Sequence, residues 1–317
     1  MGTSDRFRVR HRHGHRLAEE FRTSAGVSPA APVLVTGATG LVGSAVVREL
    51  QHSGQRVIGV SRRASGEARI DLVSREAESD LAKLGEIGGV IHCAAVFPAV
   101  DSGDGAEACR LANATMDAHV ARLAQERLCR VVMCSSASVY GPHSTDDEVE
   151  EFGPTSPEGP YARGKLESEL LFTGLGSGSV SLRITSPYGL DMTKRTVLTI
   201  FAEQARAGGP VIYFGNGTRT QDFVHVADVA RACVSALGSE SASGPFNIGS
   251  GRPIGMRELA ELFVEEAGLG GFARASGTPD PQEHQRANYS IRRAAEVLGW
   301  VPTIDLLTGL RSLVRSS

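Results

Sequence analysis

A glycine-rich turn between a short apolar run and a helical pattern restricts the fold of this chain more than any other feature. Residues 32–40 read PVLVTGATG, as a buried parallel strand does where it enters a tight turn. The following LVGSAVVRELQHSG has helical spacing and stops at Gly54. Gly37 permits the turn, Gly40 admits a pyrophosphate close to the backbone, and Gly43 lets the helix pack on the strand. We therefore predict a dinucleotide site with its phosphates at the helix amino terminus, the alternative being glycines that serve a turn alone.

Strand-like and helix-like segments alternate through the first half of the chain. Strand-like runs read RVIGVS, GVIHCAA, RVVMCSSASVYG and SVSLRITS, with helical stretches between them. This order predicts an α/β fold with a doubly wound parallel (Rossmann) sheet. After Ser186, glycines and prolines divide the chain into short pieces, which indicates a smaller mixed substrate lobe at the C-terminal side. We expect a disordered tail over residues 1–30, a dinucleotide-binding domain over 31–185 and a mainly substrate-binding lobe over 186–317, with 221–238 returning to the first domain.

Composition excludes several classes of function. The formal net charge of the 317 residues is -3, so no basic field favours a nucleic-acid partner. No apolar run is long enough for a membrane span, and the basic segment RFRVRHRHGHR lacks the apolar stretch of a secretory signal. The five cysteines are scattered without zinc spacing, so we expect no metal and reduced thiols in a cytoplasmic protein.

The end of the second predicted strand bears on the choice of cofactor. Such strands often end on an acid that holds the adenosine ribose, but here Ser61 is followed by Arg62 and Arg63. An acid suits the ribose 2′-hydroxyl, whereas arginine suits a 2′-phosphate through paired, charge-assisted hydrogen bonds. We therefore favour NADP(H), with NAD as the alternative if the two arginines face water.

Two motifs carry candidate acid–base chemistry. In YARGK, Tyr161 and Lys165 are four residues apart and share one helix face. A fixed ammonium favours the phenolate and lowers the tyrosine pKa, so the pair can pass a proton to or from a carbonyl or alcohol. Ser136 in CSSASVYG follows a predicted strand at the carboxyl edge of the sheet, where it either hydrogen-bonds a substrate oxygen or caps a turn.

Together with IHCAA, LRITSPYG, GTRTQDFVHVADVA, FNIGSGRPIGMRELA and LGWVP, these motifs resemble the extended short-chain dehydrogenase/reductase family, in its nucleotide-sugar epimerase, dehydratase and reductase branch. The resemblance implies catalytic roles for Ser136, Tyr161 and Lys165, a nucleotide-sugar substrate and a homodimer formed through long helices beside the sheet.

The resemblance also implies a set of binding residues. Asp71 would contact adenine, Asn113 would lie near the active site, and Arg219 and Arg286 are the candidates for gripping a diphosphate. The cofactor contacts would come from Gly37, Thr39, Gly40, Leu41, Val42, Ser61, Arg62, Arg63, Asp71, Leu72, Ala94, Ala95, Asn113, Tyr161, Lys165 and Pro187. The substrate contacts would come from Ser136, Ser186, Arg219, Gln221 and Arg286.

Departures from the family motifs narrow the reaction. Ala137 and Ser138 stand where sugar 4,6-dehydratases of the family carry an Asp-Glu pair, and sugar-acid decarboxylases carry a glutamate at the second place. The remaining reactions need only hydride transfer and one proton relay. Because reductases of the family more often use NADPH, we predict an NADP(H)-dependent reductase of a nucleotide-linked 4-keto sugar. An NAD-retaining 4-epimerase is the alternative, a non-catalytic dinucleotide-binding regulator is a third, and the sugar and the nucleotide stay open.

Overall fold

A seven-stranded parallel sheet forms the centre of the protein, in the order β11-β6-β5-β4-β1-β2-β3. The structure is a computed structural model that describes residues 31–62, 68–176 and 178–315, so the expected tail over residues 1–30 lies outside the described residues. The strands of the sheet are β1 (Val33–Thr36), β2 (Val57–Ser61), β3 (Ala68–Arg69), β4 (Gly89–His92), β5 (Val131–Ser136), β6 (Val180–Ile184) and β11 (Gly244–Ile248). This arrangement confirms the α/β fold predicted from the sequence.

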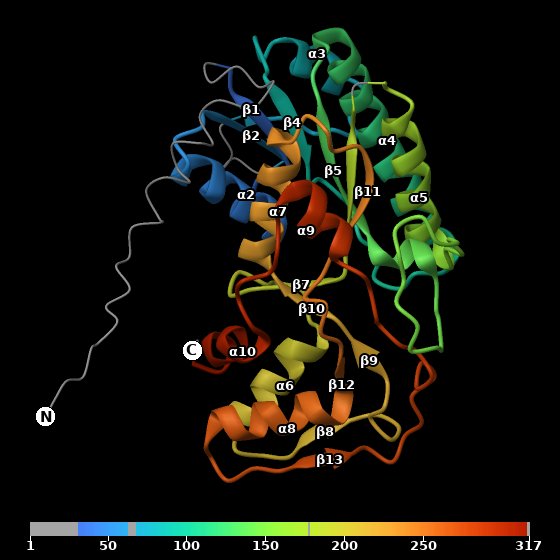
Figure 1. The fold of residues 1–317 in the computed structure, drawn as a ribbon, viewed down its shortest axis with the longest axis vertical. Helices are drawn as coiled ribbons and strands as arrows, with labels where there is room; N and C mark the ends of the chain where they lie inside the picture. The colour runs from blue at the N-terminus through green and yellow to red at the C-terminus, as the bar shows by residue number, and fades with distance from the viewer. Residues whose placement is uncertain (1–30, 63–67, 177, 316–317) are drawn as a thin grey trace, which may run out of the picture.

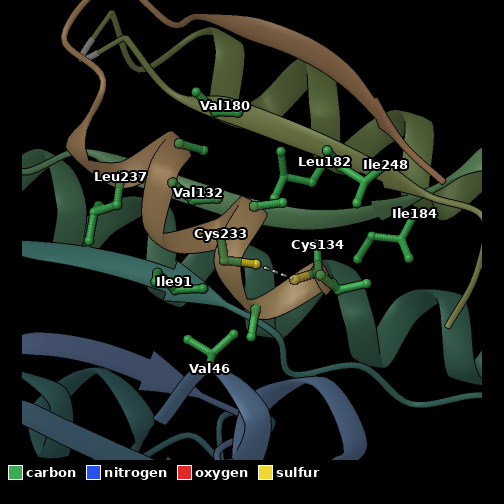
Figure 2. Packing of buried hydrophobic residues seen from close by; sticks show 14 of the residues in the cluster. Val46, Ile91, Val132, Cys134, Val180, Leu182, Ile184, Cys233, Leu237 and Ile248 are labelled. Carbon is green, nitrogen blue, oxygen red and sulfur yellow. Dashed lines mark hydrogen bonds between the residues drawn. The ribbon is translucent and has the colours of Figure 1, made fainter. Parts of the chain in front are cut away.

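Helices cover both faces of the sheet, which explains why its strands read as continuous apolar runs. Along β1, Val33 and Val35 point into one core cluster and Leu34 points into the other. The helices on the first face are α2 (Leu41–His52), α7 (Val226–Gly238) and α9 (Arg292–Leu298). Those on the second are α3 (Ala77–Ala82), α4 (Gly103–Arg127) and α5 (Gly159–Thr173). Figure 2 shows the first cluster, in which Val46 of α2 and Leu237 of α7 pack with Ile91 and Val132 of the sheet.

A third apolar cluster is formed by elements that lie beyond the carboxyl ends of the sheet strands, and Figure 1 shows these elements below the sheet. It contains Phe201, Phe263 and Leu310, each from a different helix. The elements here are β7 (Ser186–Tyr188), α6 (Val197–Arg206), β8 (Val211–Tyr213), β9 (Thr220–Gln221), β10 (Phe223–His225), β12 (Ile254–Gly255), α8 (Met256–Ala267), β13 (Ala273–Ala275) and α10 (Leu306–Arg315). Its strands form three two-stranded sheets, and together these elements make a smaller lobe over the edge of the main sheet where ligands bind in this architecture.

Neither a membrane span nor a metal cluster is found in the described part of the chain. Over residues 31–62, 68–176 and 178–315, no helix has the length and apolar character that crossing a bilayer requires. The same ranges hold no group of three or more histidine, cysteine or acidic side chains that is arranged to bind a metal ion.

Candidate active site

The glycine turn after β1 forms a tight cradle against the end of β4. Gly37 has a φ of 65°, and a Cβ atom there would lie 2.7 Å from the backbone nitrogen of Ala94. A Cβ on Gly43 would overlap the carbonyl oxygen of Gly37, so only glycine lets α2 begin this close to the turn. The amino terminus of α2 has no side-chain cap, since Gly40 is its N-cap and the helix begins at Leu41. Gly40 N donates to Gly37 O at 2.9 Å, which closes the turn, so the N–H groups that can meet an anion are those of the first turn of α2, at Leu41 and Val42. This arrangement fits a dinucleotide pyrophosphate.

The adenosine side of the cradle is only partly described. Ser61 ends β2 and is buried, and Arg62 is exposed directly after it. Arg63 lies outside the described residues. Asp71 is exposed and its Oδ1 accepts a hydrogen bond from Val73 N at 3.1 Å, while the Leu72 side chain packs into the core. The structure therefore offers an arginine and no acid at the described end of β2.

Strand β5 and helix α5 bring the three candidate catalytic residues together. Ser136 ends β5, its Oγ accepts a hydrogen bond from Ser138 N at 3.2 Å, and its side chain acts to lower the pKa of Tyr161 on α5. Lys165 lies one turn further along α5, with its Nζ atom 6.0 Å from the centroid of the Tyr161 ring. The same Nζ donates a hydrogen bond to the carbonyl oxygen of Cys134 at 2.8 Å. The arrangement can exchange a proton with a hydroxyl or carbonyl oxygen that reaches Tyr161.

The pKa of Tyr161 corrects one expectation from the sequence. Burial raises the pKa of the Tyr161 hydroxyl, and this effect outweighs the Lys165 charge and the Ser136 hydrogen bond, which act in the opposite direction. The expectation of a net lowered pKa is therefore wrong, because the degree of burial depends on loops that the YARGK spacing does not reveal. At neutral pH the group is a phenol, which suits donation of a proton to a carbonyl oxygen.

Asn113 fixes the loop that follows β4 and carries Ala94 and Ala95. Its Oδ1 accepts a hydrogen bond from Val96 N at 2.7 Å, and its Nδ2 donates to Val96 O at 2.9 Å. Ala94 N in turn donates to Thr36 Oγ1 at 3.2 Å. Asn113 thus acts on the cradle through this loop.

The candidate substrate residues gather where the lobe meets the sheet. Gln221 Nε2 donates to Ser186 Oγ at 2.6 Å, and Pro187 is in β7, which pairs with β10. Arg219 and Arg286 are engaged within the protein. Arg219 Nε donates to Asp280 Oδ2 at 2.9 Å, and Arg286 Nη1 donates to the carbonyl oxygens of Thr218, Glu283 and Gln285. A diphosphate would therefore have to compete with these acceptors for either guanidinium group.

Two contacts of Tyr161, one with an acidic residue and one with an aromatic ring, were not predicted from the sequence. Asp101 Oδ1 accepts a hydrogen bond from Tyr161 N at 2.9 Å, which fixes the loop after β4 against α5. This loop places the Phe97 ring 5.2 Å from the Tyr161 ring, and Lys194 from the lobe lies 5.1 Å from the Phe97 ring centroid. In the sequence, Phe97 and Asp101 follow IHCAA and Lys194 follows LRITSPYG. No other sequence signal marks these residues, because loops carry no periodicity.

A hollow of about 390 Å³ lies elsewhere, between α2 and the start of α7. It is lined by Arg48, His52, Asp191 and His225 among others, and by none of the three candidate catalytic residues. The candidate active site is therefore a different place, where β5 and α5 bring Ser136, Tyr161 and Lys165 together.

Comparison with known proteins agrees with this geometry. The UDP-glucose 4-epimerase of Mycolicibacterium smegmatis is 31% identical to this chain over an alignment of 320 positions. The alignment covers 89% of this chain and 96% of that protein. The dTDP-4-dehydro-6-deoxyglucose reductase of Escherichia coli is 32% identical over 202 residues, but these cover 59% of this chain and 61% of that protein. The crystal structure of the Thermus thermophilus UDP-glucose 4-epimerase complex with NAD has a TM-score of 0.78 at 27% identity, with 89% of this chain and 97% of that chain covered.

A family model extends the agreement to the whole main sheet. Residues 33–249, from the first residue of β1 to the residue after β11, match the model described as the NAD dependent epimerase/dehydratase family. This match confirms the family resemblance and the enzyme class that the motifs predict. The chain belongs to the NAD dependent epimerase/dehydratase family, as an NAD(P)-dependent enzyme.

Proposed function

We propose that the protein is a 4-epimerase of a nucleoside diphosphate sugar and retains its dinucleotide through each catalytic cycle. The observation that carries this proposal is the similarity to a UDP-glucose 4-epimerase over 89% of this chain and 96% of that protein. Similarity to a 4-keto sugar reductase extends over only 59% of this chain. The order of preference from the sequence, with the reductase first, is therefore reversed.

The side chains at the site suit the proton transfers of this reaction. Tyr161 exchanges the proton of the sugar 4-hydroxyl, Ser136 hydrogen-bonds the same oxygen, and the Lys165 ammonium stabilises negative charge on the phenol oxygen. A bound NAD would supply the acceptor and donor for hydride. The cradle at Gly37 and the amino terminus of α2 would hold its pyrophosphate.

A second candidate is an NADP(H)-dependent reductase of a nucleotide-linked 4-keto sugar. Arg62 favours it, because this residue is exposed at the end of β2 where an acid would select NAD. Arg62 and the neighbouring Arg63 would then pair with the 2′-phosphate.

We further propose that Ser186, Arg219, Gln221 and Arg286 contact the substrate, with the two arginines on its diphosphate.

A homodimer formed by α4 and α5 accounts for the exposed Leu111 and Leu170 on these helices, whose side chains are 54% and 69% accessible. Light scattering after size-exclusion chromatography tests the dimer: Leu170→Glu should give a monomer, and a wild-type monomer would refute it.

The decisive experiment compares net redox change with sugar interconversion. One sample of the purified protein is denatured, and the dinucleotide that it releases is identified. A second, native sample is incubated with UDP-glucose or UDP-galactose, and both sugars and NAD(P)H are measured. Bound NAD and interconversion without net NADH formation support the epimerase. A cofactor-free protein that oxidises NADPH with a 4-keto-6-deoxysugar nucleotide supports the reductase and overturns the first proposal.

Two variants test the residues assigned to these reactions. Tyr161→Phe should lower turnover by about 10²-fold or more, while thermal stabilisation by the dinucleotide is kept. Unchanged turnover in Tyr161→Phe would refute the proton-transfer role of Tyr161 in both proposals. Arg62→Ser should lower stabilisation by NADPH more than that by NADH, and an equal effect on the two would remove the support for the reductase.

A further inference from the structure

Three cysteine thiols lie in a row beside the candidate active site, and the proposed proton transfers use none of them. The Sγ atoms of Cys93 and Cys134 are 3.5 Å apart, and Cys134 Sγ is 3.9 Å from Cys233 Sγ. Figure 2 shows the side chains of Cys134 and Cys233 pointing toward each other within the core cluster. Cys93 is partly accessible, whereas the other two residues are buried, and all three thiols are free.

The pairing of β4 with β5 brings Cys93 and Cys134 to neighbouring positions. His92 pairs with Met133, and Cys93 and Cys134 are the next residues along the two segments. Their side chains lie on the same face of the sheet, because Cys134 is part of the core cluster against which Cys93 packs. Neighbouring strands are about 4.8 Å apart, within the range of about 4.4–6.8 Å between Cα atoms that a disulfide bridges. The backbone therefore allows a bond between these two sulfurs.

The middle thiol of the row, Cys134, loses its proton most readily. The pKa of Cys134 lies well below its ordinary value, because the thiols of Cys233 and Cys93 hydrogen-bond its sulfur. Burial opposes the charged form, and the nearby Lys165 charge favours it. The same contacts with Cys134 raise the pKa of Cys93 and of Cys233. Because the thiolate is the reactive form of cysteine, Cys134 is the nucleophile of the row, and Cys93 is the member that a reagent can reach.

The backbone that carries these two cysteines also builds the candidate site. Cys93 N donates to Thr36 O at 3.3 Å, and a Cβ atom on Gly37 would lie 2.9 Å from the carbonyl carbon of Cys93. The carbonyl oxygen of Cys134 accepts the hydrogen bond from Lys165 Nζ at 2.8 Å. A covalent bond is much shorter than the present contact between the two sulfurs, so its formation has to draw these backbone segments together. The wall of the glycine cradle and the anchor of Lys165 would both shift.

We propose that Cys93 and Cys134 are a redox-sensitive thiol pair, whose oxidation to a disulfide weakens dinucleotide binding. The oxidant is a low-molecular-weight disulfide of the glutathione type. The Cys93 thiolate attacks one sulfur of this disulfide, forms a mixed disulfide and releases one reduced glutathione. The Cys134 thiolate then attacks the Cys93 sulfur, which forms the protein disulfide and releases the second reduced glutathione. Two protein thiols are oxidised, one glutathione disulfide is reduced, and the two thiol protons end on the two released glutathione molecules.

Equilibration in glutathione buffers of increasing oxidised fraction tests this proposal on the wild-type protein. Alkylation of the remaining thiols, followed by mass analysis of peptides, should show a disulfide between Cys93 and Cys134. The dissociation constant for NAD, or for NADP if the reduced protein prefers it, is measured by calorimetry. Oxidation should raise this constant about tenfold, which is an ordinary coupling between two sites, and dithiothreitol should restore it. Absence of the disulfide at every buffer ratio, or an unchanged dissociation constant, would overturn the proposal.

Cys93→Ala and Cys233→Ala are matched variants, because each removes one of the two neighbours of the Cys134 thiol. Each variant is compared with its own reduced form. Cys93→Ala should keep its affinity for the dinucleotide after oxidation, whereas Cys233→Ala should lose affinity as the wild type does. A wild-type disulfide between Cys134 and Cys233, or an equal loss of affinity in Cys93→Ala, would refute the assigned pair.

Thermodynamic reciprocity provides a second measurement on the unaltered chain. If the disulfide weakens dinucleotide binding, the bound dinucleotide must favour the two free thiols by the same factor. A saturating dinucleotide should therefore raise about tenfold the ratio of oxidised glutathione to the square of reduced glutathione at which half of the pair is oxidised. An unchanged or lower midpoint would overturn the proposal. Neither measurement needs a substrate, so a wild-type protein that converts no sugar would overturn only the proposed function.

Discussion

The buried ion pair of Glu169 and Arg183 anchors helix α5, which carries the candidate catalytic residues, to the sheet, and replacing Glu169 by glutamine tests this anchor. Glu169 is on α5 and Arg183 is on β6, with side chains 7% and 5% accessible. Arg183 donates from Nε to Glu169 Oε1 at 3.0 Å and from Nη2 to Oε2 at 2.7 Å. Ser135 donates to the same carboxylate at 2.5 Å. Although burial opposes its charged form, Glu169 raises the pKa of Arg183 above its ordinary value, so the guanidinium group is charged.

The expected loss follows from the charge that glutamine leaves behind. Glu169→Gln keeps the shape and one acceptor oxygen, but Arg183 then stays buried and charged without a counter-charge. Removal of one partner from such a pair costs about 3–5 kcal/mol of unfolding free energy, and the retained acceptor places our expectation at about 3 kcal/mol. Glu167→Gln on the same helix is the matched control. Its pair with Arg110 involves a side chain that is 52% accessible, so its loss should be at most about 1 kcal/mol.

Urea unfolding followed by circular dichroism measures both variants. The midpoint for Glu169→Gln should fall well below that for Glu167→Gln, with the dependence on urea concentration unchanged. A loss below about 1 kcal/mol for Glu169→Gln, or one no larger than that of the control, would refute the assignment of this pair as the anchor of α5.

Two further predictions concern the turn after β1 and the start of α7. Gly37→Ala should abolish thermal stabilisation by the dinucleotide, because the new Cβ would meet the Ala94 backbone. Gly54→Ala is the control, since Gly54 has a similar φ of 75° with open space around it, and this variant should keep the stabilisation. If both variants were stabilised equally by the dinucleotide, the result would contradict the cradle. Burial lowers the pKa of His225, and the His225 ring accepts a hydrogen bond from Ala227 N. The neutral ring therefore contributes to the unfolding free energy above a pH of about 6.5. This contribution is lost as the pH falls toward the lower pKa of His225 in the folded protein. The unfolding free energy of the wild type should therefore fall more steeply with acidification than that of His225→Asn, which keeps a capping side chain, and parallel slopes would count against this role.

The main sheet and the shared helix face of Tyr161 and Lys165 were predictable from the sequence because both have local signals. Strands buried on two faces give apolar runs, and Gly37 and Gly43 mark where the backbone comes too close for any side chain. Tyr161 and Lys165 share a helix face through their spacing alone. These features depend on neighbours in the sequence, which explains why they could be predicted.

The rest of the site depends on residues distant in sequence. Asp280 engages Arg219, and nothing near Arg219 in the sequence predicts an acid that lies 61 positions away. The Tyr161 pKa depends on burial by Phe97 and its loop, and the strands of the lobe are two or three residues long, too short for any periodicity.

The path of the chain between the sheet and the lobe limits how this protein can be recombined with its relatives. The chain leaves the main sheet after β6, returns at α7 and β11, leaves for α8, returns at α9 and ends in α10 of the lobe. Trp300, just after α9, donates from Nε1 to Asp228 O of α7 at 2.9 Å, and this hydrogen bond joins two of the segments that return to the main sheet. No single crossover point separates the two parts, so a chimaera with new sugar specificity has to exchange several short inserts and leave every return segment in place.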